Sequence, residues 1–208
     1  MAKGIILVGA GGHAKVVIEI LRANGCDVHY CVGGSDAVDE CLGVPVVKGD
    51  HWLETLRSEG YSQVFIGIGP NRLRLKLAEL AQSLGYDLIN AISPSAVVSP
   101  SVTMGNGVAA MAGAIINADS TIGDLAIINT GATVDHDCHI GTAVHIAPQC
   151  GLAGTVSIGN GSFLGIGSRV IPGVAIGEWS TVGAGAVVTK DLPAHVTAVG
   201  IPARVLRK

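Results

Sequence analysis

A six-residue repeat runs through the second half of the chain. Every sixth residue from Ile92 to Val188 is apolar, and the residue two places before each, from Ala96 to Ala186, is Ala, Val, Ser or Cys. Because residues two apart on a strand point to the same side, each repeat directs one aliphatic and one small side chain inward. Each buried aliphatic contributes roughly 1.5 to 3 kcal/mol, so a narrow structure with few aromatic residues can be stable.

A second period identifies the shape of the coil. Glycines that directly follow an inward aliphatic recur every eighteen residues, and three repeats of six therefore make one triangular coil with about 4.8 Å between coils. Since glycine tolerates positive φ, we expect these glycines to adopt it at one corner of the stack. The tail from Lys190 breaks the repeat and is expected to cap the prism. The glycines are Gly105, Gly123, Gly141, Gly159 and Gly177.

The first ninety residues follow a different pattern. Strand-like segments at 4–8, 28–32 and 64–68 alternate with helix-like segments at 13–23 and 71–84. This alternation predicts a small, parallel, Rossmann-like α/β domain over residues 1–90, followed by a parallel β-helix over residues 91–208. The residues expected to face the core of the two helices include Val16, Val17, Ile20 and Leu21 of the first and Leu73 of the second.

Composition excludes several classes of protein. No uninterrupted apolar run reaches the ~20 residues of a spanning helix, although the mean hydropathy is +0.52. A net charge of -3 is unlike that of a nucleic-acid-binding domain. The five cysteines lack zinc-type spacing, so we expect reduced thiols, no metal and a cytoplasmic location. The apolar N-terminal stretch is interpreted as a first strand rather than a signal peptide.

The hexapeptide pattern and the GIPAR segment at residues 200–204 resemble those of the hexapeptide-repeat acyltransferase superfamily. The resemblance implies a left-handed β-helix, a homotrimer, and acetyl-CoA lying between neighbouring prisms. Handedness follows from the resemblance alone, because right-handed crossovers are otherwise the norm.

Four further segments narrow the resemblance: GAGGHAK at 9–15, IGPNRLR at 68–74, NAISPSAVVSPSV at 90–102 and INTGATVDHDCHIG at 128–141. In this order they resemble bacterial N-acetyltransferases that act on nucleotide-linked 4-amino-4,6-dideoxy sugars. Members of that group act on UDP-linked bacillosamine precursors and on GDP-perosamine, and sialic acid O-acetyltransferases share the architecture. We expect a UDP-linked substrate first and GDP-perosamine next.

Acetyl transfer to an amine requires a base, a donor for the oxyanion, and a site that holds both substrates together. Histidine suits the base because its pKa lies near neutrality, and the repeat places His136, His139 and His145 outside the prism. The resemblance implies that His136 is the base and that Asp137 orients it. It also places Asn129 and His145 near the reacting groups, whereas His139 is expected to be a surface residue.

The coil period also indicates a coenzyme contact. Gly154 follows His136 by eighteen residues and should lie directly above it, and the resemblance implies that this glycine amide meets the thioester carbonyl. We expect Ile166 to contact the coenzyme as well. Candidates for binding its phosphates are Lys190, Arg204, Arg207 and Lys208, although tail charges commonly serve solubility.

The loop at residues 9–14 follows a strand and precedes a helix, a place where backbone amides bind phosphates. The resemblance assigns it to the nucleotide diphosphate of the sugar substrate; a dinucleotide is less favoured because the unit lacks a second half. Many relatives carry aspartates after the second strand, where this chain has GGSD. The residues predicted to bind the sugar nucleotide are Gly9, Gly11, Gly12, His13, Asp36, Asn71 and Arg72.

Three alternatives stay open at this point. A γ-type carbonic anhydrase shares the β-helix, but its zinc ligands need an HxxxxH pair and a distant histidine, a spacing that His136, His139 and His145 do not have. A non-catalytic sugar-nucleotide-binding scaffold would need no base. An O-acetyltransferase of sialic acid or another sugar is also possible, because a base that serves an amine can serve a hydroxyl.

Overall fold

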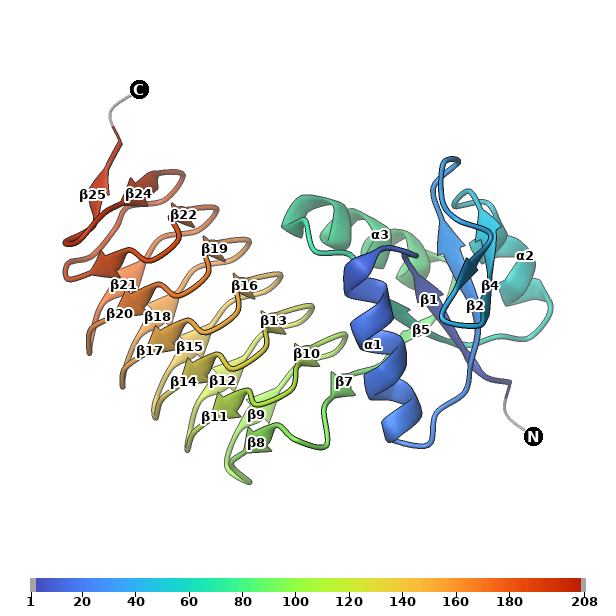
Figure 1. The fold of residues 1–208 in the computed structure, drawn as a ribbon, viewed down its shortest axis with the longest axis horizontal. Coiled ribbons are helices and arrows are strands. Elements are labelled where there is room, and N and C mark those ends of the chain that lie inside the picture. The colour runs from blue at the N-terminus through green and yellow to red at the C-terminus, as the bar shows by residue number, and fades with distance from the viewer. Residues whose placement is uncertain (1–2, 207–208) are drawn as a thin grey trace. The chain divides into compact units, whose positions relative to one another are not determined.

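The computed structural model describes residues 3–206, which form two compact units divided between Pro94 and Ser95 (Figure 1). The N-terminal unit holds a six-stranded sheet in the order β3-β4-β2-β1-β5-β6. Its pairings are parallel except for β3–β4, so the sheet is mixed rather than fully parallel. The elements are β1 Ile5–Val8, α1 Gly12–Ala23, β2 Val28–Gly33, β3 Glu40–Cys41, β4 Val44–Lys48, α2 Trp52–Ser58, β5 Gln63–Ile66, α3 Asn71–Ser83, β6 Asp87–Leu88 and β7 Ala91–Ile92.

Two residues expected in the helix cores are exposed. Val16 is 37% exposed because the buried stripe of α1 runs through Ala14, Val17, Ile18 and Leu21, at helical spacings of three and four. On α3, Leu73 is 45% exposed and its neighbour Arg74 is buried instead. These two expectations were wrong.

The second unit is a triangular prism of two-residue strands (Figure 1). From β8 to β20, each strand pairs in parallel with the one eighteen residues later, as in Thr133↔Gly151, so one coil does span three repeats. We call the three sheets the first, second and third face. Within residues 95–206, the first contains β10 Ala109–Ala110, β13 Ile127–Ile128, β16 His145–Ile146, β19 Phe163–Leu164, β22 Thr181–Val182, β24 Thr197–Val199 and β25 Arg204–Val205. The second contains β8 Val97–Val98, β11 Ile115–Ile116, β14 Thr133–Val134, β17 Gly151–Leu152, β20 Arg169–Val170 and β23 Val187–Val188. The third contains β9 Thr103–Met104, β12 Thr121–Ile122, β15 His139–Ile140, β18 Ser157–Ile158 and β21 Ala175–Ile176.

The core of the prism follows the predicted register. The second residue of each two-residue strand is the predicted inward aliphatic, and from Ala110 to Val188 every one is buried. The small residues two places earlier are buried from Val108 to Ala186. This register fixes which side chains point outward, including all three histidines of interest.

The glycines that recur every eighteen residues have a different structural role from the one predicted. None of them has positive φ; that conformation recurs at every sixth residue from Gly107 to Gly185, two places further along each turn. A Cβ on Gly159 would instead lie 2.5 Å from the backbone nitrogen of Glu178 in the next coil. These glycines are present because neighbouring coils approach too closely for a side chain.

The tail continues the ladder before it ends. Leu192 bridges Ile176 of β21, β24 pairs in parallel with β22, and β25 returns antiparallel to β24. Within residues 3–206, no helix is long and apolar enough to cross a membrane.

Replacing Gly159 with alanine should destabilise the prism by about 3 kcal/mol, because an added Cβ collides with backbone that cannot move aside. Gly167→Ala is the comparison: it has φ of +70° but open space around it, so it should cost about 1 to 2 kcal/mol. Denaturant titrations of the two variants measure the difference. Equal stabilities of Gly159→Ala and the unaltered chain would contradict close coil approach.

Candidate functional site

His136 lies exposed at the corner between β14 and β15, and its hydrogen bonds define its tautomer. Its Nδ1 donates to Asp137 Oδ2 at 2.7 Å. With the proton on Nδ1, the unprotonated Nε2 carries the lone pair that a general base requires. The predicted pairing of these two residues is therefore present in the geometry.

The backbone at Asp137 contributes to this pairing. Asp137 has φ of +56°, the left-handed conformation that every prism corner uses at this position. Aspartate tolerates it better than most residues. Asp137 N donates to Ala118 O at 3.0 Å, which fixes the turn to the coil below. The corner thus directs the short carboxylate at the imidazole.

Gly154 lies one coil above and touches the imidazole. A Cβ there would be 2.5 Å from His136 Cε1 and 2.6 Å from Nε2, so only glycine leaves room for the ring in this position. Within residues 3–206 no group accepts a hydrogen bond from the Gly154 amide. A backbone donor is thereby placed beside the imidazole.

The electrostatics of the corner favour a more basic imidazole. The hydrogen bond to Asp137 raises the pKa of His136 above its ordinary 6.5, and the charges of Asp135 and Asp137 act in the same direction. Desolvation acts in the opposite direction and lowers the pKa of His136, but it does not outweigh these effects because the ring is exposed. His136 is consequently a stronger base than a free histidine.

Asn129 and His145 form a second pair. Asn129 Nδ2 and His145 Nε2 are 3.0 Å apart, and the His145 ring packs edge-on against Phe163, with 5.2 Å between ring centroids. These side chains line a largely apolar groove of about 410 Å³ on the first face, together with Ile166, which is 54% exposed. The groove suits an extended ligand with an apolar segment.

The two pairs occupy different corners of the prism. Asn129 precedes β14 and His136 follows it, so they flank opposite ends of the second face. His139 is exposed on the third face, where its Nδ1 lies 2.9 Å from Thr121 Oγ1. Within one chain, the predicted catalytic set is thus divided between two corners.

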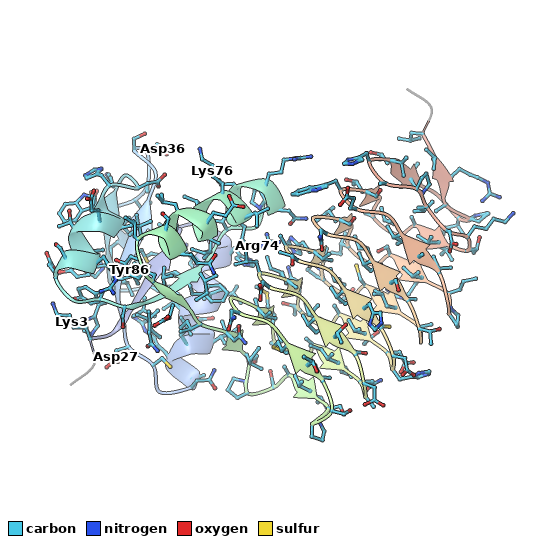
Figure 2. The ribbon with its side chains drawn as sticks, turned by 180° about the vertical axis from the view of Figure 1, so that it is seen from behind. Lys3, Asp27, Asp36, Arg74, Lys76 and Tyr86 are labelled. Atoms are coloured by element: carbon cyan, nitrogen blue, oxygen red, sulfur yellow. The ribbon has the colours of Figure 1, made fainter. Side chains whose placement is uncertain are left out.

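The N-terminal unit contains a pocket of about 490 Å³ at the carboxyl ends of β1 and β2. Of the residues predicted to bind the sugar nucleotide, Gly9, Gly11 and Asp36 line this pocket, and Figure 2 shows the Asp36 side chain pointing outward from the loop after β2. A Cβ at Gly11 would meet only open space. Its apolar walls include Leu73, which explains why that residue is exposed.

Sequence reasoning missed Asp50, which also lines this pocket. Asp50 follows β4, and β4 lies beside β2 in the sheet. Because the carboxyl ends of parallel strands meet at one edge, an acidic residue after each strand was the available signal. It was overlooked because β4 was not expected.

Several other predicted residues lie beside the pocket rather than in its lining. Burial, followed by the charge of Arg74, lowers the pKa of His13 to about 4, so the ring is neutral near pH 7. Arg74 (Figure 2) donates to the carbonyl of Gly69 and to Asn71 Oδ1, which holds the loop before α3. Gly12, the first residue of α1, and Arg72 are exposed. The roles of Gly12, His13, Asn71 and Arg72 stay predictions.

The coenzyme-phosphate candidates are at the far end of the prism. Lys190 and Arg204 are exposed, and Arg204 Nη1 donates to Ala203 O. Arg207 and Lys208 lie outside the described residues. Within residues 3–206, no group of three or more His, Cys, Asp or Glu side chains could hold a metal ion.

Comparisons with known proteins agree with this two-part architecture. Residues 4–81 match the family model "PglD N-terminal domain", and residues 155–190 match "Bacterial transferase hexapeptide (six repeats)". A structure of perosamine N-acetyltransferase from Caulobacter crescentus, in complex with CoA and GDP-perosamine, is 57% identical, with a TM-score of 0.96 over 100% of this chain and 99% of that one. The acetyltransferase domain of PglB from Neisseria gonorrhoeae, in complex with acetyl coenzyme A, is 38% identical, with a TM-score of 0.92 over 99% and 100% of the two chains.

The chain belongs to this family of hexapeptide-repeat sugar acetyltransferases. A putative acetyltransferase of Staphylococcus aureus is 54% identical over 56 residues, but that match spans only 27% of this chain and 28% of the relative. The full-length structural relatives therefore carry the assignment.

The basicity of His136 can be measured without a substrate. The pKa of its imidazole should lie above 6.5 and should fall toward 6.5 in Asp137→Asn, because the acceptor that stabilises the protonated ring is weakened. Proton NMR titration of the ring, assigned with His136→Ala, gives both values. Asp124→Asn removes an exposed carboxylate elsewhere and should leave the His136 titration unchanged; an unmoved pKa in Asp137→Asn would contradict the pairing.

Proposed function

We propose that the protein is an acetyl-CoA-dependent N-acetyltransferase that acetylates the 4-amino group of a GDP-linked 4-amino-4,6-dideoxy sugar. The observation that carries the proposal is the juxtaposition at one corner of a base, its orienting carboxylate and a backbone donor: His136, Asp137 and Gly154. Acyl transfer to an amine requires a base and an oxyanion donor, and this corner offers a candidate for each.

The three residues perform separate parts of one step. His136 Nε2 accepts the proton that the sugar nitrogen loses as its bond to the acetyl carbon forms and the carbon–sulfur bond breaks. The Gly154 N–H stabilises the negative charge that develops on the carbonyl oxygen. Asp137 stabilises the imidazolium and keeps Nε2 directed outward. The proton then passes to the departing thiolate.

The groove on the first face fits the donor substrate. When bound, acetyl-CoA supplies an activated acyl group on a good leaving thiolate, so no covalent enzyme intermediate is needed. Ile166 and Phe163 offer apolar contact along the groove, and Asn129 and His145 provide polar groups at its end. Lys190 and Arg204 remain candidates for its phosphates.

The acceptor's nucleotide is proposed to bind in the N-terminal pocket. Exposed glycine amides at the start of α1 suit a diphosphate. Asp36 and Asp50 supply carboxylates, which suit the N–H and amino donors of guanine or the ribose hydroxyls better than the carbonyl-rich edge of uracil. Together with the 57% identical relative whose structure is in complex with CoA and GDP-perosamine, these carboxylates support a GDP-linked over a UDP-linked substrate, the reverse of the order expected from sequence.

A homotrimer with sites between subunits accounts for the divided catalytic set. A cyclic arrangement that brings the His136 corner of one chain to the Asn129 corner of the next would complete three equivalent sites. Each chain would contribute the base to one site, and Asn129 and His145 to the other.

Incubation with acetyl-CoA and a panel of acceptors tests the reaction. Thiol release should be fastest with GDP-perosamine, slower with UDP- and dTDP-linked 4-amino sugars, and negligible with sialic acid. His136→Ala should lower kcat by roughly 10² to 10⁴ with nucleotide-sugar binding intact, because only the base is lost. Turnover of no 4-amino sugar would refute the proposal, and full activity of His136→Ala would refute the role of the base.

Complementation between two inactive variants tests the shared site. His136→Ala and the double variant Asn129→Ala with His145→Ala are coexpressed with different tags, and trimers carrying both tags are purified. Every mixed trimer then holds one intact interface of three, so about a third of the wild-type rate should return. Sites contained within one chain would leave these trimers as inactive as their parents.

A further inference from the structure

A second carboxylate adjoins His136 and has no part in the reaction described above. Asp135 Oδ1 accepts two hydrogen bonds, from Asn117 Nδ2 at 3.0 Å and from the backbone amide of His136 at 2.8 Å. Asn117 precedes Asp135 by eighteen residues and occupies the same place on the coil below. Asn117, on the coil below, therefore holds the Asp135 carboxylate, and that carboxylate in turn holds the backbone amide of His136.

Both backbone polar atoms of His136, and the carbonyl of Asp135 before it, are hydrogen-bonded. Its amide donates to Asp135 Oδ1, and its carbonyl accepts from Thr155 N at 2.9 Å. The carbonyl of Asp135 accepts from Ser120 Oγ at 2.7 Å. An exposed turn would otherwise sample several conformations, and a base acts efficiently only when its geometry is held before the substrate arrives.

We propose that Asp135, anchored by Asn117, is a positioning residue for His136: it fixes the His136 backbone amide and presents a second negative charge to the imidazole. The proposal rests on the proposed function only in taking His136 as the base. Asp135 acts through that histidine and needs no contact with either substrate.

The charges facing the imidazole are few. Asp135 and Asp137 lie on its own turn, Asp119 lies on the turn below, and the turn above contributes the uncharged Gly154 and Thr155. The hydrogen bond from Asn117, then that from the His136 amide, lowers the pKa of Asp135, so its charge persists at neutral pH. That charge raises the pKa of His136, after the larger effect of the Asp137 hydrogen bond.

Two substitutions separate the geometric contribution from the electrostatic one. Asp135→Asn keeps an oxygen that can accept from the His136 amide and removes the charge, whereas Asp135→Ala removes both. We expect Asp135→Ala to lower kcat about tenfold, with KM for both substrates within twofold of wild type. Asp135→Asn should recover most of that loss.

The pH dependence provides the readout that a purely structural role would not change. A neutral base is required, so kcat/KM rises with pH through the pKa of His136. Asp135→Asn should shift this limb to lower pH, because one of the charges that stabilise the imidazolium is absent. Asn117→Ala keeps the charge of Asp135 but removes the hydrogen bond that anchors it. This variant should lower kcat several-fold and shift the rise of kcat/KM with pH much less than Asp135→Asn does.

The closing experiment is NMR titration of the His136 ring in wild type, Asp135→Asn and the control Asp119→Asn, which removes the same charge one coil below. The pKa of His136 should fall in Asp135→Asn and change less in Asp119→Asn. An unchanged pKa, or equal shifts in the two variants, would overturn the proposal. Because the titration needs no substrate, it stands apart from the acceptor panel, whose failure would refute the proposed function instead.

Discussion

The inward packing of one aliphatic and one small side chain in every six residues is the constraint on which the rest of the prism depends. It closes the core around residues such as Val134 and Ile140, and it fixes which positions face outward. Parallel pairing at intervals of eighteen then places each outward residue above its counterpart in the coil below. The His136 ring and Gly154 meet because of this stacking, although they are distant in sequence.

The repeat made most of this half of the molecule predictable, because periodicity reports directly which side chains are buried. It predicted His136 on the outside with Gly154 above it, and the structure confirms both. It located Gly159 but not the reason for that glycine, because a glycine required by close backbone approach and one required by positive φ would recur with the same period. In the N-terminal unit, Leu73 was assigned to the core from its helical spacing. Apolar residues that line a pocket have the same spacing as core residues, and only the fold distinguishes them.

Because the prism fixes the backbone of this corner, few side-chain interactions are needed to place Asp137 beside His136. Asp137 adopts a left-handed conformation common to every turn of the prism, so its placement follows from the scaffold. Ser120 and Asn117, from the coil below, contribute ordinary hydrogen bonds that hold the turn. The acidic residues beside the imidazole thus combine two effects, orientation and charge. Neither requires burial, and this corner is exposed to solvent.

The eighteen-residue period has a consequence for how such a protein can change its length. A deletion or duplication of one whole coil shifts the prism along its axis but returns every later residue to the same corner. A change of six residues would instead rotate everything beyond it by a third of a turn, carrying His136 to a corner with other neighbours. Insertions and deletions that preserve the site are therefore whole coils of eighteen residues, and a chain that gained a third of a coil would need different residues at the site.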